Sequence, residues 1–136
     1  MKTHVYPALI LAALAGCAAQ TPAPKVVHAW ESPAADYPAI CMLMRSDGTV
    51  AFKGGFQFYQ PGTWRQDGQT GMLTLTLGGT APFPADIAKV QLRSKIGALT
   101  AYNEQRRELT YKVGANTPFI ALGNFYFYRT DACHGA

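Results

Sequence analysis

The chain has 136 residues, of which 49% are apolar, and it carries a formal net charge of +4. A length of this order suits one domain, and the apolar content is enough for a buried core, which excludes wholesale disorder. The positive charge is modest and spread along the sequence, which argues against a nucleic-acid-binding surface.

The N-terminus has the pattern of a cleaved signal peptide. Lys2 provides a short positive region, and Ala8 to Leu14 form an apolar run that is too short to span a bilayer as a mature helix. The following Leu14-Ala15-Gly16-Cys17 resembles the lipobox of bacterial lipoproteins, in which the peptide is cleaved before a cysteine whose thiol carries diacylglycerol. An ordinary secretory signal with a chance cysteine is the alternative.

The lipobox resemblance implies a lipoprotein that is anchored through lipid, palmitate included, on Cys17 and does not span the membrane. Ala18 follows the cysteine at a place where lipoproteins of the inner membrane often carry Asp. The resemblance therefore favours the periplasmic face of the outer membrane, in an organism with two membranes. Residues 18–24 contain two prolines and predict a tether of at most about 23 Å. The expected divisions are a signal peptide, a lipidated tether and a single β domain, at residues 1–16, 17–24 and 25–136.

Beyond the tether, the sequence predicts short strands separated by turn residues. Lys25–Trp30 predicts an edge strand, and a proline-containing loop follows over Glu31–Ala39. Ile40–Arg45 and Val50–Tyr59 flank Ser46-Asp47-Gly48-Thr49, whose turn chemistry predicts a hairpin.

Gly54-Gly55 predicts a bulge or a sharp bend in the second strand of that hairpin. The clearest strand is Met72–Leu77, in which leucines alternate with threonines at the period of a half-buried antiparallel strand. A short strand at Thr63-Trp64-Arg65 and a turn at Asp67–Gly71 precede it. Further strands are predicted at Ile87–Leu92, Ala98–Tyr102, Glu108–Val113 and Asn124–Arg129. For the first of these, a short helix over Ala85–Ile96 is the alternative.

This spacing of strands predicts an all-β fold, a small antiparallel β-barrel or sandwich of about 7 to 9 strands. The stretch Leu43–Leu77 combines an Asp-Gly-Thr turn, an aromatic strand, a second Asp-Gly turn and Leu-Thr-Leu-Thr-Leu. It resembles the meander of small lipocalin-like domains in bacterial envelope lipoproteins, among them the META domain family and a copper-stress outer-membrane lipoprotein family. The resemblance implies a shape rather than an activity. The Cys-x-x-Cys pair of the copper-stress family has no counterpart here.

The cysteines predict a disulfide. With Cys17 committed to lipid, Cys41 and Cys133 remain in an exported chain, where disulfides persist. In the chain-entropy model, a loop of about 90 residues corresponds to a stabilisation on the order of 4 to 5 kcal/mol. The alternatives are a reactive thiol and a metal site completed by His28 and His134, although the spacing matches no compact zinc motif.

Patterns typical of enzymes are missing from the sequence. The serines Ser32, Ser46 and Ser94 all lie outside a G-x-S-x-G context. Asp47 and Asp67 each precede glycine, which indicates turn chemistry rather than a pair of catalytic carboxylates. The sequence therefore favours a non-catalytic protein without cofactor or metal.

Aromatic residues provide the candidate binding surface. The run Phe125-Tyr126-Phe127-Tyr128 places phenylalanines on one face of a strand and tyrosines on the other. One interpretation is a central strand with tyrosine hydroxyls bonded at its margins, and the other is a patch that binds a partner or lines a ligand site. The candidate patch consists of Tyr126, Tyr128, Phe56, Phe58 and Tyr59. The basic doublet Arg106-Arg107 is predicted to be a solvated pair in a loop, with contact to anionic lipid or an acidic partner as the alternative.

Two classes of function agree with these features. The first is a membrane-anchored periplasmic lipoprotein that binds a protein, as an inhibitor or immunity protein or as an accessory in envelope assembly. The second is a lipocalin-like carrier that holds a small apolar ligand inside the barrel. A filled interior with an exposed aromatic patch favours the first class, and an open internal cavity favours the second.

Overall fold

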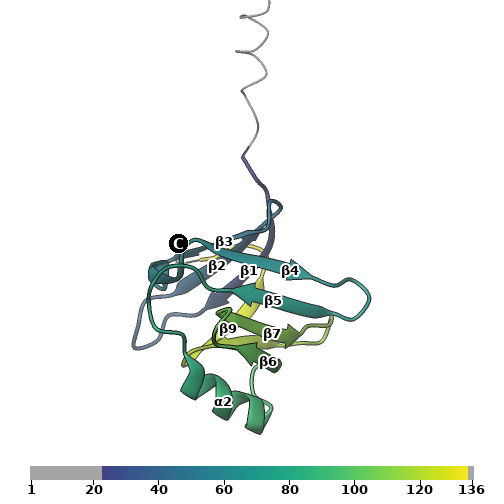
Figure 1. Cartoon of the computed structure of the whole chain (residues 1–136). Coiled ribbons are helices and arrows are strands. Elements are labelled where there is room, and N and C mark those ends of the chain that lie inside the picture. The colour runs from purple at the N-terminus through teal and green to yellow at the C-terminus, as the bar shows by residue number, and fades with distance from the viewer. Residues whose placement is uncertain (1–22, 135–136) are drawn as a thin grey trace, which may run out of the picture.

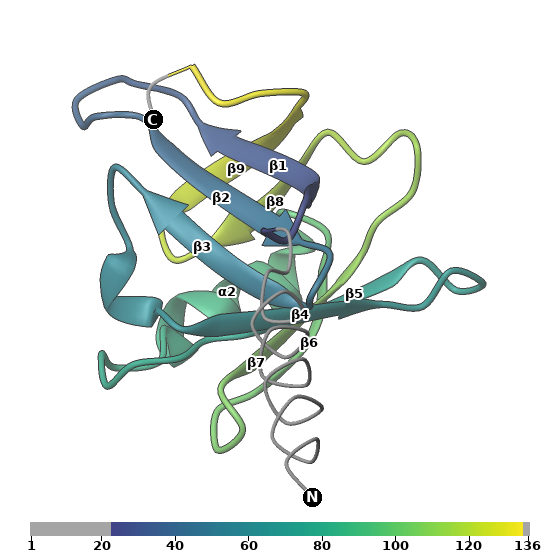
Figure 2. The same ribbon diagram turned by 90° about the horizontal axis from the view of Figure 1, so that it is seen from above.

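In the computed structural model, the described part of the chain, residues 23–134, forms a nine-stranded antiparallel sheet that curves into a nearly closed barrel (Figures 1 and 2). The order across the sheet is β6-β7-β5-β4-β3-β2-β1-β9-β8. The strands are β1 (Val26–Ser32), β2 (Ile40–Arg45), β3 (Thr49–Lys53), β4 (Gly62–Gln66), β5 (Met72–Thr76), β6 (Leu99–Asn103), β7 (Glu108–Lys112), β8 (Phe119–Leu122) and β9 (Phe125–Thr130). The predicted all-β class is confirmed, and the sheet is a barrel rather than a sandwich.

The segment before residue 23 carries several of the predictions. The signal peptide, Cys17 and residues 18–22 of the tether lie outside the described residues. Within residues 23–134, no helix has the length and apolar character that crossing a membrane requires.

The barrel has two distinct ends, which the register of β1 and β2 defines. Val26 lies opposite Arg45, and Ser32 lies opposite Ile40. The chain therefore enters at the end that also holds the β2–β3 turn and the β4–β5 hairpin, which we call the entry end. The β1–β2 loop lies at the other end, which we call the far end (Figure 1).

β1 has a more central place than the sequence predicts. It pairs with β2 on one side and with β9 on the other, so that Ala29 lies opposite both Leu43 and Thr130. The edge-strand prediction was wrong because the prolines that suggested it flank the strand instead of lying in it. The strand also continues to Ser32, and the predicted loop is correspondingly shorter.

β3 ends earlier than predicted. Gly54 has a φ of +84°, and a Cβ at this position would overlap the carbonyl oxygen of Ala39. Phe56 is also left-handed, with a φ of 67°, and leads into the short 3-10 helix η2 (Gln57–Tyr59). The bend predicted at Gly54-Gly55 is confirmed, whereas the strand predicted beyond it is a turn of helix.

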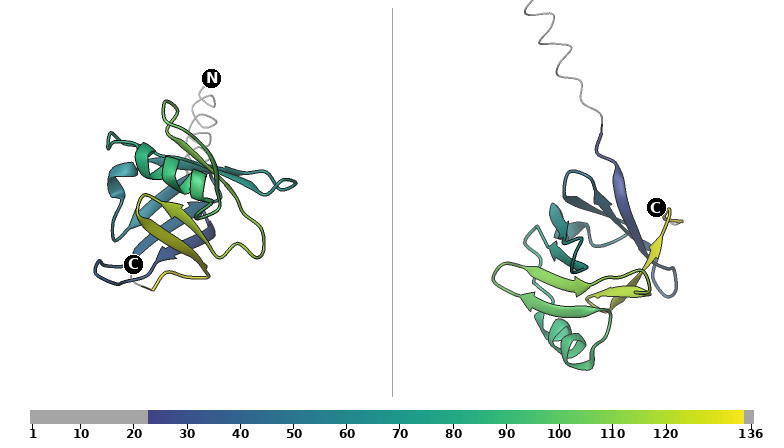
Figure 3. Two further views of the ribbon diagram at one scale, coloured as in Figure 1. Left: turned by 90° about the horizontal axis from the view of Figure 1, so that it is seen from below. Right: turned by 90° about the vertical axis from the view of Figure 1, so that its right-hand side faces the viewer.

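The strand predicted at Ile87–Leu92 is wrong, because this segment belongs to the helix α2 (Ala85–Ser94). The buried residues have the spacing of one helix face: Ala88 and Gln91, three positions apart, are buried, whereas Val90 between them is exposed. The Gln91 Nε2 donates a hydrogen bond of 2.8 Å to the carbonyl oxygen of Gly123 in the β8–β9 turn. This contact holds α2 against the far end of the barrel (Figure 3).

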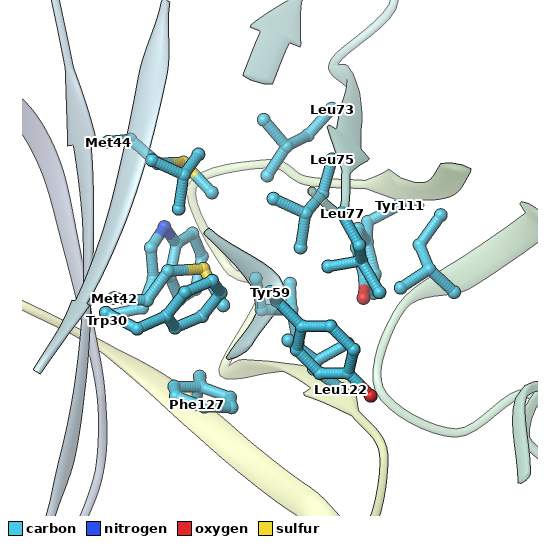
Figure 4. Packing of buried hydrophobic residues seen from close by; sticks show 14 of the residues in the cluster. Trp30, Met42, Met44, Tyr59, Leu73, Leu75, Leu77, Tyr111, Leu122 and Phe127 are labelled. Atoms are coloured by element: carbon cyan, nitrogen blue, oxygen red, sulfur yellow. The ribbon is translucent and has the colours of Figure 1, made fainter. Parts of the chain in front are cut away.

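Inward-facing side chains fill the barrel (Figure 4). Leu73 and Leu75 point into it from β5, which confirms the alternation predicted for Met72–Leu77. Each fully buried side chain of this kind stabilises the fold by about 1.5 to 3 kcal/mol relative to an exposed one. The largest inward side chains that are almost completely buried are Trp30, Tyr111, Phe127, Met42, Met44, Leu73, Leu75, Leu109, Ile120 and Leu122. The interior is therefore a packed core.

The barrel closes where the two ends of the sheet, β6 and β8, approach each other. The N–H of Ala121 donates a hydrogen bond of 3.2 Å to the carbonyl oxygen of Gly97, just before β6. Gly97 has a φ of +68°, and a Cβ there would overlap Ala121. Glycine at this position thus allows both the left-handed backbone conformation and the close contact across the seam.

Candidate functional site

A disulfide holds the C-terminal tail against the outside of the barrel. Cys41 and Cys133 are bonded, with their Cα atoms 5.9 Å apart across a sequence separation of 92 residues. Because Cys41 alternates with the inward-facing Met42, the bridge lies on the outer face of β2. This confirms the predicted bridge. Within residues 23–134, no group of three His, Cys, Asp or Glu side chains is placed to hold a metal ion.

The tail also contacts β1. The backbone N–H of His134 donates a hydrogen bond of 2.8 Å to one carboxylate oxygen of Glu31, and the His134 Nδ1 lies 3.1 Å from the other. Glu31 and Cys41 are opposite each other on neighbouring strands. The tail therefore covers a polar and a sulfur-bearing side chain that would otherwise face solvent, which explains their burial.

The tyrosines of β9 lie on the outer face, as the alternation predicts. Tyr126 is 40% exposed and Tyr128 is 43% exposed, whereas Phe127 is completely buried between them. On β8, the ring of Phe119 stacks on that of Tyr126 with a centroid distance of 4.6 Å. It also lies 5.3 Å from the ring of Tyr128. Three aromatic rings thus form a continuous cluster on the outside of the barrel.

The β1–β2 loop extends this cluster to the far end. Tyr37 is 66% exposed, and its ring meets that of Phe125 edge-on at 5.7 Å. A shallow hollow of about 230 Å³ lies between this loop and β9, lined by Tyr37, Phe125 and both tyrosines of β9. We use the name aromatic surface for five residues, namely Tyr37, Phe119, Phe125, Tyr126 and Tyr128. Sequence reasoning missed Tyr37, for which an aromatic residue between two prolines of a loop was the available signal.

The other three residues of the predicted patch lie around η2. Tyr59 is buried, and this burial raises the pKa of its hydroxyl. Phe56 is half-buried, with its ring 5.2 Å from Phe125 and 5.9 Å from Phe127. Phe58 is exposed. Phe56 therefore joins Phe125 of the aromatic surface to Phe127 in the core.

The basic doublet is not a solvated pair. Arg107 is half-buried and donates through Nε and Nη2 to the carbonyl oxygens of Leu77, Gly78 and Ala81, at 3.1, 3.1 and 2.8 Å. The exposed Arg106 forms an ion pair of 3.3 Å with Glu108. The prediction for Arg107 was wrong because the segment after β5 folds back over the β6–β7 turn and offers its carbonyl groups to the guanidinium.

Two carboxylates that precede glycine serve the turns, as predicted. Asp47 Oδ1 accepts hydrogen bonds from the hydroxyl and the N–H of Thr49, at 2.6 and 3.0 Å, which lower its pKa. Asp67 Oδ1 accepts one from the N–H of Gln69 at 2.8 Å, which lowers the pKa of Asp67 in the same way. These hydrogen bonds fix the β2–β3 and β4–β5 turns.

Comparison with models of protein families, with curated proteins and with solved structures finds no match for this chain. The lipocalin-like resemblance therefore rests on the sequence pattern alone. What the structure defines is a small antiparallel barrel with a filled interior, a disulfide-bonded tail and an aromatic surface on β8, β9 and the β1–β2 loop.

Proposed function

We propose that this protein is a non-catalytic, membrane-anchored periplasmic lipoprotein that binds another protein through its aromatic surface. One observation carries the proposal: the interior is packed with side chains, while stacked aromatic rings are left exposed outside. A carrier of an apolar ligand needs the opposite arrangement, an internal cavity lined by such side chains. An inhibitor, an immunity protein or an accessory of envelope assembly needs a rigid surface and no active site.

The composition and rigidity of the aromatic surface favour protein binding. Tyrosine is enriched at the energetic centres of protein interfaces, because it buries a large area and keeps a polar hydroxyl for hydrogen bonding. The stacking of Phe119 on Tyr126 fixes both rings before a partner arrives. Side chains that are already ordered lose less conformational entropy on binding, which strengthens the complex.

The position of the surface supports a partner located away from the membrane. The chain enters β1 at Val26, and the loop that carries Tyr37 follows the other end of the same strand. Seven residues of strand separate the two ends by about 20 Å. A protein anchored through Cys17 on a tether of at most about 23 Å would present Tyr37 and Phe125 toward the periplasm.

A pull-down with a matched pair of variants tests the proposal. The bait is the domain of residues 25–136, and proteins and lipids captured from envelope extract are both identified by mass spectrometry. The variant Tyr126→Ser/Tyr128→Ser should lose capture of a specific protein with a nearly unchanged melting temperature, since surface substitutions usually change stability by less than ~0.5 kcal/mol.

The control is Val26→Ser/Val27→Ser, which removes two apolar side chains, each 48% exposed, at the entry end. It should capture the same protein as the wild type. Equal capture by the tyrosine variant would rule out this surface, and a bound lipid without a protein would favour the carrier instead.

A further inference from the structure

A pocket of about 410 Å³ opens to solvent at the entry end of the barrel, at the edge of the packed core rather than as an enclosed cavity within it. This volume lies within the range of about 300 to 1,000 Å³ that is typical of small-molecule sites. Apolar and polar side chains from segments far apart in the sequence line it. Those that bear on its chemistry are His28, Trp30, Gln66, Leu73, Val113 and Arg129.

Trp30, which lines the pocket, carries a buried donor that lacks an acceptor. The indole Nε1 of Trp30 is buried and has no hydrogen-bond partner within residues 23–134. In contrast, the Nε1 of Trp64 donates a hydrogen bond of 2.8 Å to the carbonyl oxygen of Arg45. An indole nitrogen only donates, and leaving it unpaired in a core is unfavourable. In Figure 4, the nitrogen lies on the side of the ring toward Met44 and Leu73, and Leu73 is a wall of the pocket.

A cation lies beside this donor. The guanidinium carbon of Arg129 is 5.0 Å from the centre of the Trp30 ring, over its face. The side chain is exposed and donates through Nη2 to the carbonyl oxygen of Gly114 at 3.2 Å. None of the residues that line the pocket in the described chain carries a carboxylate. The pocket therefore combines a positive charge, an unused donor and apolar walls.

We propose that this pocket binds a small organic carboxylate with an apolar body. The carboxylate accepts hydrogen bonds from the Trp30 Nε1 and the Arg129 guanidinium, and the apolar body packs against Leu73 and Val113. In the complex, the exposed Arg129 side chain rotates from its place over the indole ring so that an oxygen atom reaches Nε1. A pure hydrocarbon would leave Nε1 unpaired, and an inorganic anion would leave the apolar walls unmatched.

This site goes beyond the protein-binding function proposed above and does not depend on it, because inward-facing side chains such as Trp30 line the pocket at the entry end, whereas the aromatic surface lies on the outer face of β8 and β9 and on the β1–β2 loop. A test specific to the pocket is a titration of the isotope-labelled mature chain, carrying Cys17→Ser for solubility, with benzoate. The readout is the pair of indole N–H resonances in a proton–nitrogen NMR spectrum. The Trp64→Phe variant assigns the resonance of Trp30.

Benzoate should shift the Trp30 indole resonance saturably and leave that of Trp64 almost unchanged. Benzamide, which keeps the ring and a carbonyl oxygen but lacks the charge, should bind more weakly. Arg129→Met should lower the benzoate affinity about tenfold, as expected for the loss of a charge-assisted hydrogen bond, and abolish the difference between the two probes. Arg93→Met, which removes an exposed arginine of α2, should bind like the wild type.

Three results would overturn the proposal: no saturable shift at millimolar benzoate, equal binding of benzoate and benzamide, or equal affinity of the Arg129→Met variant. The Trp30→Phe variant adds a second measurement, because it keeps a ring in the core and removes only the donor side of the indole. If it folds, its benzoate affinity should also fall, as followed through the methyl resonances of Val113. If the Trp30→Phe variant does not fold, the benzoate affinity of Arg129→Met still tests the proposal, because the Arg129 side chain is exposed and its replacement should leave the fold intact.

Discussion

The hydroxyl of Tyr111 on β7 donates a hydrogen bond of 2.6 Å to the carbonyl oxygen of Ala121 on β8, inside the barrel and across its seam. Both residues are completely buried. The strands β6 and β8 are the two edges of the sheet, each with one neighbouring strand. Together with the hydrogen bond between Ala121 and Gly97, the Tyr111 hydrogen bond joins β8 to the β6–β7 edge. Tyr111 therefore contributes to barrel closure as well as to the core.

Replacing Tyr111 with Phe should lower the free energy of unfolding by roughly 1 to 3 kcal/mol. The ring still fills the core, but the Ala121 carbonyl group loses its buried partner. Urea denaturation measures the difference. Tyr126→Phe, which removes an exposed hydroxyl, should change stability by less than ~0.5 kcal/mol. Equal stability of the two variants would show that the hydrogen bond contributes nothing to closure.

The same residue predicts how stability depends on alkaline pH. Burial raises the pKa of Tyr111 far above its ordinary value of 10.0. Above that value the unfolded chain releases a proton that the folded chain keeps, so the stability of the wild type should fall as pH rises past about 10. Tyr111→Phe should lose less stability over the same range. Parallel curves of stability against pH for the two proteins would show that Tyr111 does not cause the loss of stability at alkaline pH.

Gly97→Ala should destabilise the barrel by roughly 1 to 3 kcal/mol, in the range of overpacked cores. Its Cβ would overlap Ala121, and the left-handed backbone adds strain. Thermal unfolding is the measurement. Gly114→Ala is the control, because a Cβ at Gly114 meets no other atom within 4 Å. A Gly97→Ala variant as stable as this control would mean that the seam accommodates the added methyl group without a loss of stability.

Removing the disulfide should weaken the fold without abolishing it. The intact mass of the purified domain should be two hydrogens below that of the reduced composition. Cys41→Ala/Cys133→Ala should fold but lose about 2 to 5 kcal/mol of stability, because the bridge closes a long loop. Two thiols that alkylate freely without reductant would contradict the bridge, and an unchanged melting temperature would contradict its stabilising role.

Cys17→Ser should abolish lipidation and yield a soluble or unprocessed protein. The lipobox requires a thiol at this position, since an alcohol does not take its place as the acceptor of diacylglycerol. Cell fractionation with a carbonate wash is the measurement. A variant that stays with the membranes would contradict the lipobox interpretation. The wild type should fractionate with the outer membrane, and recovery with the inner membrane would remove the argument from Ala18.

Local chemistry explains which elements the sequence predicts. In Met72–Leu77 the leucines point into the core and the threonines alternate with them on the other face, so the sequence itself shows the period of a strand, although Thr74 is also buried. β8 (Phe119–Leu122) was missed because three of its four residues are buried in a row, and four apolar residues without alternation fit a strand or a helix equally well. The segment of α2 was assigned to a strand for a related reason, since its buried face includes the polar Gln91 while the apolar Val90 is exposed, so that its apolar pattern is weak.

The candidate sites were predictable only where one strand carries them. Tyr126 and Tyr128 share a face because they are two residues apart, which needs no knowledge of the fold. The entry-end pocket depends on β1 pairing with β9, which brings Trp30 opposite Arg129 from almost 100 positions away. Neither propensity nor periodicity contains information about such a pairing, and the proline-rich flanks of β1 pointed to an edge instead.

The central place of β1 has a mechanical consequence for a protein held by its N-terminus. A pull on the chain before residue 23 acts along β1, whose hydrogen bonds to β2 and β9 run across the direction of the force. If a partner grips the far end, these bonds bear the load together in shear instead of opening one at a time. The covalent link from β2 to the tail clamps the same region from outside. Resistance to forced unfolding follows the unfolding rate, so loading β1 in shear should slow the unfolding of a barrel that is pulled from its N-terminus.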